Sequence, residues 1–200
     1  AMRERHWREI MSAVKKEFTL PAKNPKMLLK ELLDLNLHLH SNEIEEITDK
    51  AIKEAKHEAL LANLETTWST VEFSMNLYKD TDVPLLRLED EIIEQLESDQ
   101  MAVQSIVGGR YGHFKEQAGI WQKSLGAVSD VVMLLVELQR TWSYLEPLFI
   151  ASDEVKKELP EDAKRFQKID EQVRQFLQKA WKTRNVKQVC VAPGLFAKLT

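Results

Sequence analysis

Apolar residues recur every three or four positions along most of the chain, a spacing that is typical of amphipathic helices. The longest stripe runs through residues 111–146 and predicts one helix of roughly 54 Å, at a rise of 1.5 Å per residue. Its apolar members are Phe114, Ala118, Trp121, Leu125, Val128, Val132, Leu135, Leu138, Trp142 and Leu145. Shorter stripes predict further helices over residues 3–17, 26–35, 41–68, 89–107 and 160–181.

Between residues 71 and 88 the hydrophobic period changes from three or four to two, which predicts a half-buried strand. The apolar residues are Val71, Phe73, Met75 and Leu77, and they alternate with Glu72, Ser74, Asn76 and Tyr78. Residues 79–82 read as a turn and residues 83–88 as the return strand. Because two strands alone are marginally stable in water, the apolar face of this hairpin is expected to lie against helices.

Glycine and proline mark the breaks between the helical stripes. Gly108 and Gly109 interrupt the pattern before the long helix. Pro147 is expected to stop that helix, because proline donates no backbone hydrogen bond and its ring clashes with a preceding carbonyl group. Pro160 suits the first position of the helix that follows.

These patterns predict a mainly α fold, an elongated helical bundle with one long helix and a small β-hairpin insertion. The chain has 200 residues, of which 44% are hydrophobic, so it can bury a core and is not a disordered chain. We expect two parts, residues 1–110 with the hairpin near 71–88, and residues 111–200 around the long helix. The pattern fades after Trp181 without an ending, so the helical bundle is expected to continue beyond Thr200.

The charge balance gives no reason to expect nucleic acid or an anionic membrane as a partner. Twenty-eight basic and 32 acidic residues leave a net charge of only −4. The best membrane candidate, Val131–Val136, is far shorter than the about 18 apolar residues of a membrane span. Cys190 is the single cysteine, which excludes an internal disulfide, and its apolar neighbours indicate an inert thiol.

No catalytic, cofactor or metal site is predicted. His38 and His40 form an H-x-H pair, which could bind a metal but is a weak signal without further ligands nearby. Residues 108–110 lack the spacing of a phosphate-binding loop. The carboxylate-rich runs read as solvated helix faces with partners four residues away, such as Glu46 with Lys50.

Aromatic and histidine side chains elsewhere are interpreted as packing residues. The tryptophans on apolar stripes are Trp68, Trp121 and Trp142. The isolated histidines, read as surface or packing residues, are His6, His57 and His113.

Three motifs between Trp121 and Phe166 resemble the second N-terminal region of dynein heavy chains, which includes much of the linker. The family pattern is W-Q-K-x-L, then E-V-Q-R-x-W-x-x-L-E-x-I-F, then L-P-x-x-x-x-R-F. The matching residues are Trp121, Gln122, Lys123, Leu125, Glu137, Gln139, Arg140, Trp142, Leu145, Glu146, Phe149, Leu159, Pro160, Arg165 and Phe166. Upstream segments such as LETTWSTVEFSM extend the resemblance over nearly the whole chain.

The segment NVKQVCVAPGLFAKL is similar to axonemal, outer-arm-like heavy chains. The chain departs from the family pattern at Leu135, where axonemal relatives often have tryptophan, and at the Gly108–Gly109 pair, which replaces small polar residues.

The resemblance implies a mechanical role and no cofactor of the segment's own. A dynein linker lies across a ring of AAA+ ATPase modules and bends and straightens to produce the power stroke. Implied partners are that ring, the dynein tail and its associated chains, and microtubules through a separate stalk, in the cytoskeleton of a cilium or flagellum. The sequence contains no Walker motif, so this segment is expected not to hydrolyse ATP.

Residues at breaks and on packed stripes are the structural or hinge candidates of such an arm. They are Gly108, Gly109, Trp121, Arg140, Trp142, Glu146, Pro147, Pro160 and Phe166. The alternative is a static helical scaffold or adaptor that only binds protein partners. The hairpin and the lack of an internal repeat near 100 residues disfavour a spectrin-like scaffold.

Overall fold

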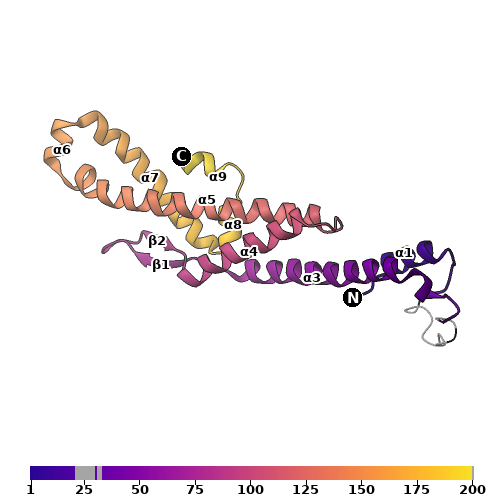
Figure 1. Cartoon of the computed structure of the whole chain (residues 1–200). Coiled ribbons are helices and arrows are strands. Elements are labelled where there is room, and N and C mark those ends of the chain that lie inside the picture. Colours follow the sequence, from indigo (N-terminus) through magenta and orange to yellow (C-terminus); the bar gives the residue numbers. More distant parts are fainter. Residues whose placement is uncertain (21–29, 31–32, 200) are drawn as a thin grey trace. The chain divides into compact units, whose positions relative to one another are not determined.

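The structure, a computed structural model, describes the chain except for residues 21–29, 31–32 and 200 (Figure 1). It is mainly α with one antiparallel hairpin in the described part, which confirms the predicted fold class. The helices are α1 Glu4–Val14, the 3-10 helix η1 Leu37–His40, α3 Ser41–Thr70, α4 Asp90–Gly108, α5 Lys115–Glu146, the π-helical turn η2 Pro147–Ala151, α6 Asp153–Glu158, α7 Pro160–Thr183, α8 Val186–Cys190 and α9 Leu195–Leu199. Most of the helix predicted over residues 26–35 lies outside the described residues.

The chain forms two compact units that are discontinuous in sequence. Unit 1 comprises residues 1–63 and 106–117, and unit 2 comprises residues 64–105 and 118–200. Helices α3, α4 and α5 therefore contribute residues to both units. The predicted division into residues 1–110 and 111–200 refers to parts of a dynein linker and not to these compact units, so it stays a prediction.

Unit 1 is built on the first part of α3, with α1 beside it (Figure 1). Its apolar cluster contains Ile10 and Val14 of α1 and Ile47 of α3, all buried. Trp7 packs edge-on against Phe18, with ring centroids 6.1 Å apart. α1 ends three residues earlier than predicted, because Lys15 adopts a left-handed conformation (φ 52°) that cannot continue a helix.

Unit 2 has its core along the buried stripe of α5. The buried α5 residues are Ala118, Trp121, Leu125, Val128, Val131, Leu135, Gln139 and Trp142. Trp68 of α3 and Leu177 of α7 are likewise completely buried. The helical period located the core face of α5 to within one residue, because Val131 and Gln139 are buried in place of the predicted Val132 and Leu138. The burial of all three tryptophans predicted to pack is confirmed.

The hairpin consists of β1 Ser74–Leu77 and β2 Pro84–Arg87, paired antiparallel within the predicted range. Its predicted facing is wrong at the end of β1, because Leu77 is 57% exposed whereas Tyr78 is buried. The Tyr78 ring packs on Trp142, at 4.7 Å between centroids, and this aromatic contact outweighs the simple alternation.

Pro147 ends the α-helical ladder as predicted, but it does not end the helical path. The chain continues through one π-helical turn, η2, before Ser152 caps α6 by accepting a hydrogen bond from the Val155 amide at 3.3 Å. In η2, Phe149 stacks on Phe166 of α7, at 5.3 Å between ring centroids. Pro160 opens α7 at its first position, as predicted.

The segment Lys115–Ala151 is long and apolar enough to cross a membrane by length and composition alone. This corrects the expectation drawn from Val131–Val136, which considered only an unbroken apolar run. The finding is weak support for a membrane span, since core helices of water-soluble proteins meet the same criterion. Here α5 buries one stripe in unit 2, although apolar residues also lie outside that stripe.

Candidate functional site

A cluster of aromatic and charged side chains joins the hairpin to the end of α5 and to α7. We call it the joint cluster, and it contains Tyr78, Lys79, Trp142, Glu146, Asp170 and Arg174. All of these residues belong to unit 2. The cluster lies directly before Pro147, so it surrounds the point where the α-helical ladder of α5 stops.

Trp142 occupies the apolar side of the joint cluster and is 2% exposed. Its indole nitrogen donates a hydrogen bond to Asp170 at 2.8 Å, so the polar edge of the ring is satisfied although it is buried. The Arg174 guanidinium lies over the ring at 5.3 Å and donates from Nε to both oxygens of Asp170 at 2.9 Å. Trp142 therefore holds α5 to α7 by packing and by hydrogen bonding together.

Glu146 forms the polar side of the joint cluster. Its carboxylate accepts from the Tyr78 hydroxyl at 3.1 Å, pairs with Lys79 at 3.3 Å and pairs with Arg174 at 3.5 Å. Because its side chain is only 14% exposed, these contacts are partly shielded from water. One carboxylate thus connects the hairpin, the end of α5 and α7.

Gln139 lies about one helical turn before Trp142 on α5 and binds the hairpin. Its side-chain oxygen accepts from the Leu86 amide at 2.6 Å, and its side-chain nitrogen donates to the Leu86 carbonyl at 2.9 Å. The buried amide therefore takes the place of a third strand beside β2. In the sequence Gln139 stands out only as a member of the family motif, since the predicted apolar stripe contains Leu138 in its place.

A second connection ties the start of the hairpin to the end of α7. The Asn185 side-chain nitrogen donates to the carbonyl groups of Trp68, Ser69 and Val71 at 3.1–3.2 Å. Its oxygen caps α8 by accepting from the Gln188 amide at 2.9 Å. We call this the Asn185 latch, and it fixes the start of α8 in the region where the sequence pattern faded.

Trp68, next to the Asn185 latch, repeats the pairing that Trp142 makes. Its indole nitrogen donates to the buried Asp99 of α4 at 2.9 Å, and Gln95 donates to the other oxygen of Asp99 at 2.8 Å. Two tryptophan–aspartate pairs thus fix α3 to α4 and α5 to α7.

The other predicted hinge candidates lie apart from the joint cluster. Trp121 is buried, and the Lys187 ammonium lies 3.9 Å from its ring centre. Gly108 and Gly109 fall in the 106–117 stretch of unit 1, where α4 ends. Arg140 is exposed on α5.

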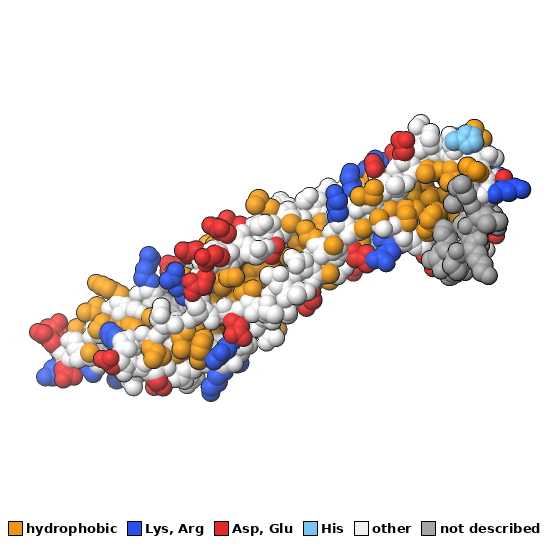
Figure 2. Space-filling model, turned by 90° about the horizontal axis from the view of Figure 1, so that it is seen from below, with side chains coloured by type: hydrophobic (Ala, Val, Ile, Leu, Met, Phe, Trp, Pro, Cys, Tyr) orange, Lys and Arg blue, Asp and Glu red, His pale blue; other side chains and the backbone are white. Residues whose placement is uncertain are grey.

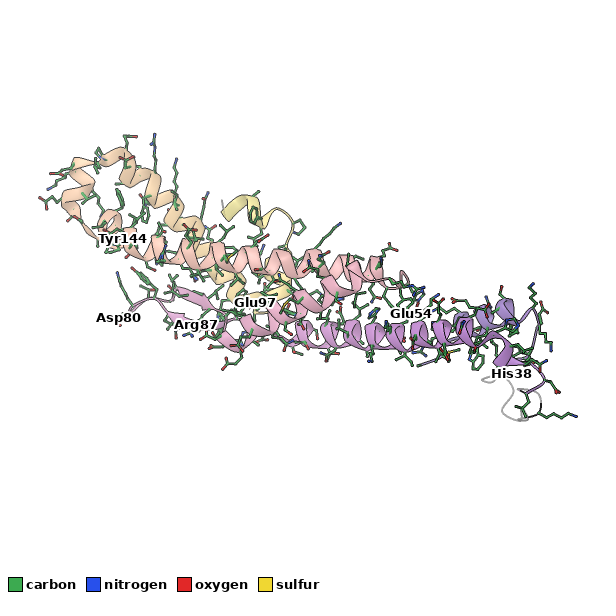
Figure 3. All side chains as sticks on the ribbon, in the orientation of Figure 1. His38, Glu54, Asp80, Arg87, Glu97 and Tyr144 are labelled. Atoms are coloured by element: carbon green, nitrogen blue, oxygen red, sulfur yellow. The ribbon has the colours of Figure 1, made fainter. Side chains whose placement is uncertain are left out.

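Unit 1 holds a buried ion pair that the sequence did not reveal. Glu54 of α3 is 1% exposed, and one of its oxygens accepts from Arg5 at 2.7 Å and contacts Nε2 of His6 at 3.0 Å (Figure 3). The Nδ1 atom of His6 accepts from the Arg3 amide at 3.0 Å, so the ring proton resides on Nε2 and points to Glu54. The sequence predicts solvated faces for the glutamate-rich runs, because helical periodicity does not single out one glutamate as buried.

The surroundings shift the pKa of three groups. The contacts of Lys79 with Tyr78 and Glu146 raise the pKa of its ammonium group. Burial acts to raise the pKa of Glu54, but the hydrogen bonds from Arg5 and His6 outweigh it and hold that pKa below its usual value. Burial raises the pKa of the Cys190 thiol to about 12, in agreement with the inert thiol expected there.

Other predicted contacts are rearranged or remain unsupported. Lys50 pairs with Glu9 at 2.6 Å and Glu46 pairs with Arg110 at 3.2 Å, so the predicted Glu46–Lys50 pair is wrong. Among the described residues no group of three or more His, Cys, Asp or Glu is placed to hold a metal ion, and His40 lies 3.4 Å from Glu43.

Comparison with known proteins identifies the family of this chain. Residues 1–200 match the family model "Dynein heavy chain, N-terminal region 2". The chain belongs to the dynein heavy chain family. This dynein segment is 42% identical over its full length to the dynein alpha chain of the flagellar outer arm from Chlamydomonas reinhardtii. It is 39% identical to a ciliary dynein beta chain from Heliocidaris crassispina and 40% identical to dynein axonemal heavy chain 9 from Homo sapiens, again over 200 residues.

These relatives confirm the resemblance to the N-terminal region of axonemal dynein heavy chains. The dynein segment spans only 4% of the length of each of these three relatives.

Proposed function

We propose that this segment is part of the mechanical linker of an axonemal dynein heavy chain. In the parent protein it lies over the AAA+ ring and bends and straightens during the ATP-driven power stroke along microtubules. The segment itself acts by moving as a body and takes no part in the chemistry of ATP hydrolysis.

The cross-bracing of unit 2 is the observation that best supports this proposal. The joint cluster, the Gln139 clamp and the Asn185 latch tie the hairpin to helices from three places in the sequence. Close-packed interiors deform little, so a body braced in this way can transmit force between its ends. Bending is then concentrated at breaks between braced bodies.

The proposal carries a location and a set of partners with it. The relatives are flagellar, ciliary and axonemal dyneins by name, which supports a place in the axoneme of a cilium or flagellum. The partners are the AAA+ ring of the same heavy chain, and the tail and associated chains of the complex. Microtubules are reached only through the stalk of the parent protein.

The test replaces Gly108 and Gly109 together by alanine in the parent heavy chain. We expect ATP binding by the ring to stay nearly intact and the microtubule gliding velocity to change, because the ring is then coupled to a stiffer arm. Gliding velocity and ATPase rate are measured on the same protein. The matched control is Gly119→Ala within α5, where an added Cβ meets nothing within 4 Å, as at Gly108.

The outcomes test two hypotheses separately: that the hinge lies at Gly108 and Gly109, and that the segment has a mechanical role at all. If velocity and ATPase rate both stay at wild-type values, the glycines only end α4 and the bend lies near Pro147. If the velocity is indifferent even to deletion of all 200 residues, the mechanical proposal fails. A static scaffold that binds partners then replaces it, and complex assembly rather than velocity would respond to the deletion.

A further inference from the structure

Helix α5 carries an apolar surface that its buried stripe does not explain. A groove of about 400 Å³ runs between β2 and α5 in unit 2. Its apolar lining comes from Leu85, Leu86, Leu88, Ile93, Val132 and Val136. Hydrophobic side chains also reach the surface in several patches on the face that Figure 2 shows.

Several side chains in and beside the groove remain exposed in the described structure. Val136 is 56% exposed and Ile93 is 37% exposed, and the neighbouring Met133 is 64% exposed. Single exposed apolar residues need no explanation, but a concave cluster of them is typical of a binding surface. Met133 and Val136 also help make Lys115–Ala151 apolar enough to resemble a membrane span.

Positive charge borders the groove. Arg140 lines it and is exposed, and no carboxylate among the described residues forms an ion pair with it. Arg87 also lines the groove (Figure 3), is 57% exposed at its side chain, and lies 3.9 Å from the exposed Asp90. The border therefore offers two guanidinium groups whose hydrogen-bonding capacity is largely unused, which favours a partner with carboxylates.

The backbone of β2 beside the groove indicates whether the partner is an extended peptide or a helix. An extended peptide would bind by adding a strand to β2, but the amide and carbonyl of Leu86 are already bonded to Gln139. A helix needs no such partners, because it satisfies its own backbone groups. The lining residues Val132 to Ser143 span about 16 Å at 1.5 Å per residue, which is roughly three helical turns.

We propose that this groove binds an amphipathic helix with an apolar stripe flanked by carboxylates, supplied by the same heavy chain outside residues 1–200. The heavy chain is the favoured source because the segment is only 4% of the length of its relatives, so nearly all of the parent chain lies outside it. A helix from the same chain also binds at a high effective concentration. Val132 and Val136 contact the apolar stripe, and Arg87 and Arg140 pair with the carboxylates.

The first experiment measures the chemistry of the groove on the 200-residue segment. The probe is a fluorescent peptide of about 14 residues with leucine at positions i, i+3, i+4 and i+7 and glutamate at the flanks. We expect saturable binding that weakens roughly tenfold or more with Val136→Asp, since a charge then replaces a buried contact. Met101→Asp is the control, because Met101 is 66% exposed on α4 and does not line the groove.

A charge-reversal variant distinguishes a lost ion pair from misfolding, because a misfolded variant would lose binding of every peptide. Arg140→Glu is expected to weaken binding of the peptide with glutamate flanks. It should strengthen binding of the same peptide with lysine flanks. Absence of saturable binding, equal affinity for both peptides, or no loss with Val136→Asp would overturn the proposal. Concentration-dependent dimerisation abolished by Val136→Asp would also overturn it, because the occupant is then a second copy.

The second experiment identifies the source in the assembled motor. A photo-crosslinking amino acid at position 136 of the parent heavy chain is activated, and the adduct is mapped by mass spectrometry. We expect an adduct to a helical segment of the same heavy chain that carries acidic residues. An adduct to another protein of the complex, or none above the level seen from position 101, contradicts the proposed source. Gliding velocity plays no part in this readout, so it does not depend on the proposed linker function.

Discussion

The two units of the segment hold their helices together by different polar contacts. Unit 1 uses an ion pair, in which the buried Glu54 receives Arg5 and His6. Unit 2 also has ion pairs, which Glu146 and Asp170 form with Lys79 and Arg174. It adds side-chain amides and indoles, which bond to backbone groups and to aspartates. An ion pair loses its advantage when one partner changes charge, whereas a neutral amide keeps its hydrogen bonds. The amides of Gln139 and Asn185 in unit 2 therefore hold their contacts independently of charge.

The largest effect is expected from Trp142→Ala in unit 2. The ring is 2% exposed, and its loss removes packing against Tyr78 and the hydrogen bond to Asp170. We expect the free energy of unfolding to fall by about 3–5 kcal/mol, measured by urea denaturation. Tyr144→Ala is the control, since Tyr144 is 71% exposed on the same helix and should cost under about 0.5 kcal/mol. A loss below about 1 kcal/mol for Trp142→Ala would mean that the ring does not carry the core of unit 2.

The ion pair of unit 1 is tested by Glu54→Ala. Removal of the carboxylate leaves Nε2 of His6 without its acceptor, while Arg5, 32% exposed at its side chain, can turn to water. We therefore expect a loss near the low end for a broken buried pair, about 3 kcal/mol. Glu58→Ala is the control, because the Arg3–Glu58 pair is exposed and should contribute under about 1 kcal/mol. Equal losses for both variants would show that burial of Glu54 is unimportant.

The amide clamp of unit 2 is tested by Gln139→Ala. The change leaves the amide and carbonyl of Leu86 without side-chain partners beside a buried helix face. We expect a loss of about 2 kcal/mol and faster hydrogen exchange at the Leu86 amide. Gln122→Ala, at an exposed position of α5, should change neither quantity. Unchanged exchange at Leu86 would indicate that water replaces the amide and that the hairpin is not clamped.

Acid should act on unit 1 through Glu54. Its pKa in the folded state lies below the ordinary value of 4.5, so its contribution to stability is present above that pH. The contribution is lost as the pH falls through the lower, folded-state pKa, because the protonated carboxyl no longer attracts Arg5. We expect the gap in unfolding free energy between wild type and Glu54→Gln to shrink between pH 6 and pH 3, measured by urea denaturation. A gap that stays constant over this range would contradict the assigned direction of the pKa.

Sequence patterns predicted the elements of both units better than their polar contacts. The period of α5 identified the face that buries Trp121 and Trp142, because burial of a helix stripe repeats with the helix itself. Neither Gln139 nor Glu54 could be assigned a partner, because the partners lie 53 and 48 residues away and no local rule sets their distance.

The facing of Tyr78 and the path beyond Pro147 also escaped prediction, for a related reason. Each depends on an aromatic contact made across the fold, Tyr78 with Trp142 and Phe149 with Phe166. Such contacts override local alternation and local breaker signals. Trp142 and Glu146 were matched as members of one motif, but their contacts with Tyr78, Asp170 and Arg174 were not foreseen.

The smallest effect is expected from Gly108→Ala at the end of α4. An added Cβ meets nothing within 4 Å, and the backbone of Gly108 is not in the left-handed region that requires glycine. Alanine should therefore raise stability by about 0.5–1 kcal/mol, because it restricts the unfolded chain more than glycine does. The measurement is the urea midpoint at a constant slope, with Gly194→Ala as the opposite control, since its φ of 72° strains alanine.

The sign of the change in unfolding free energy on Gly108→Ala shows whether the described conformation requires glycine. A loss of stability would mean that the described conformation itself needs glycine, and the hinge argument would lose its basis at this position. A gain, combined with an altered gliding velocity in the parent motor, would mean that glycine serves a second conformation in which the end of α4 takes up torsions closed to alanine. The buried stripe of α5 in unit 2 contains no glycine. There Gln139 bonds to the hairpin and Trp142 bonds to α7, so the helix is held by both neighbours.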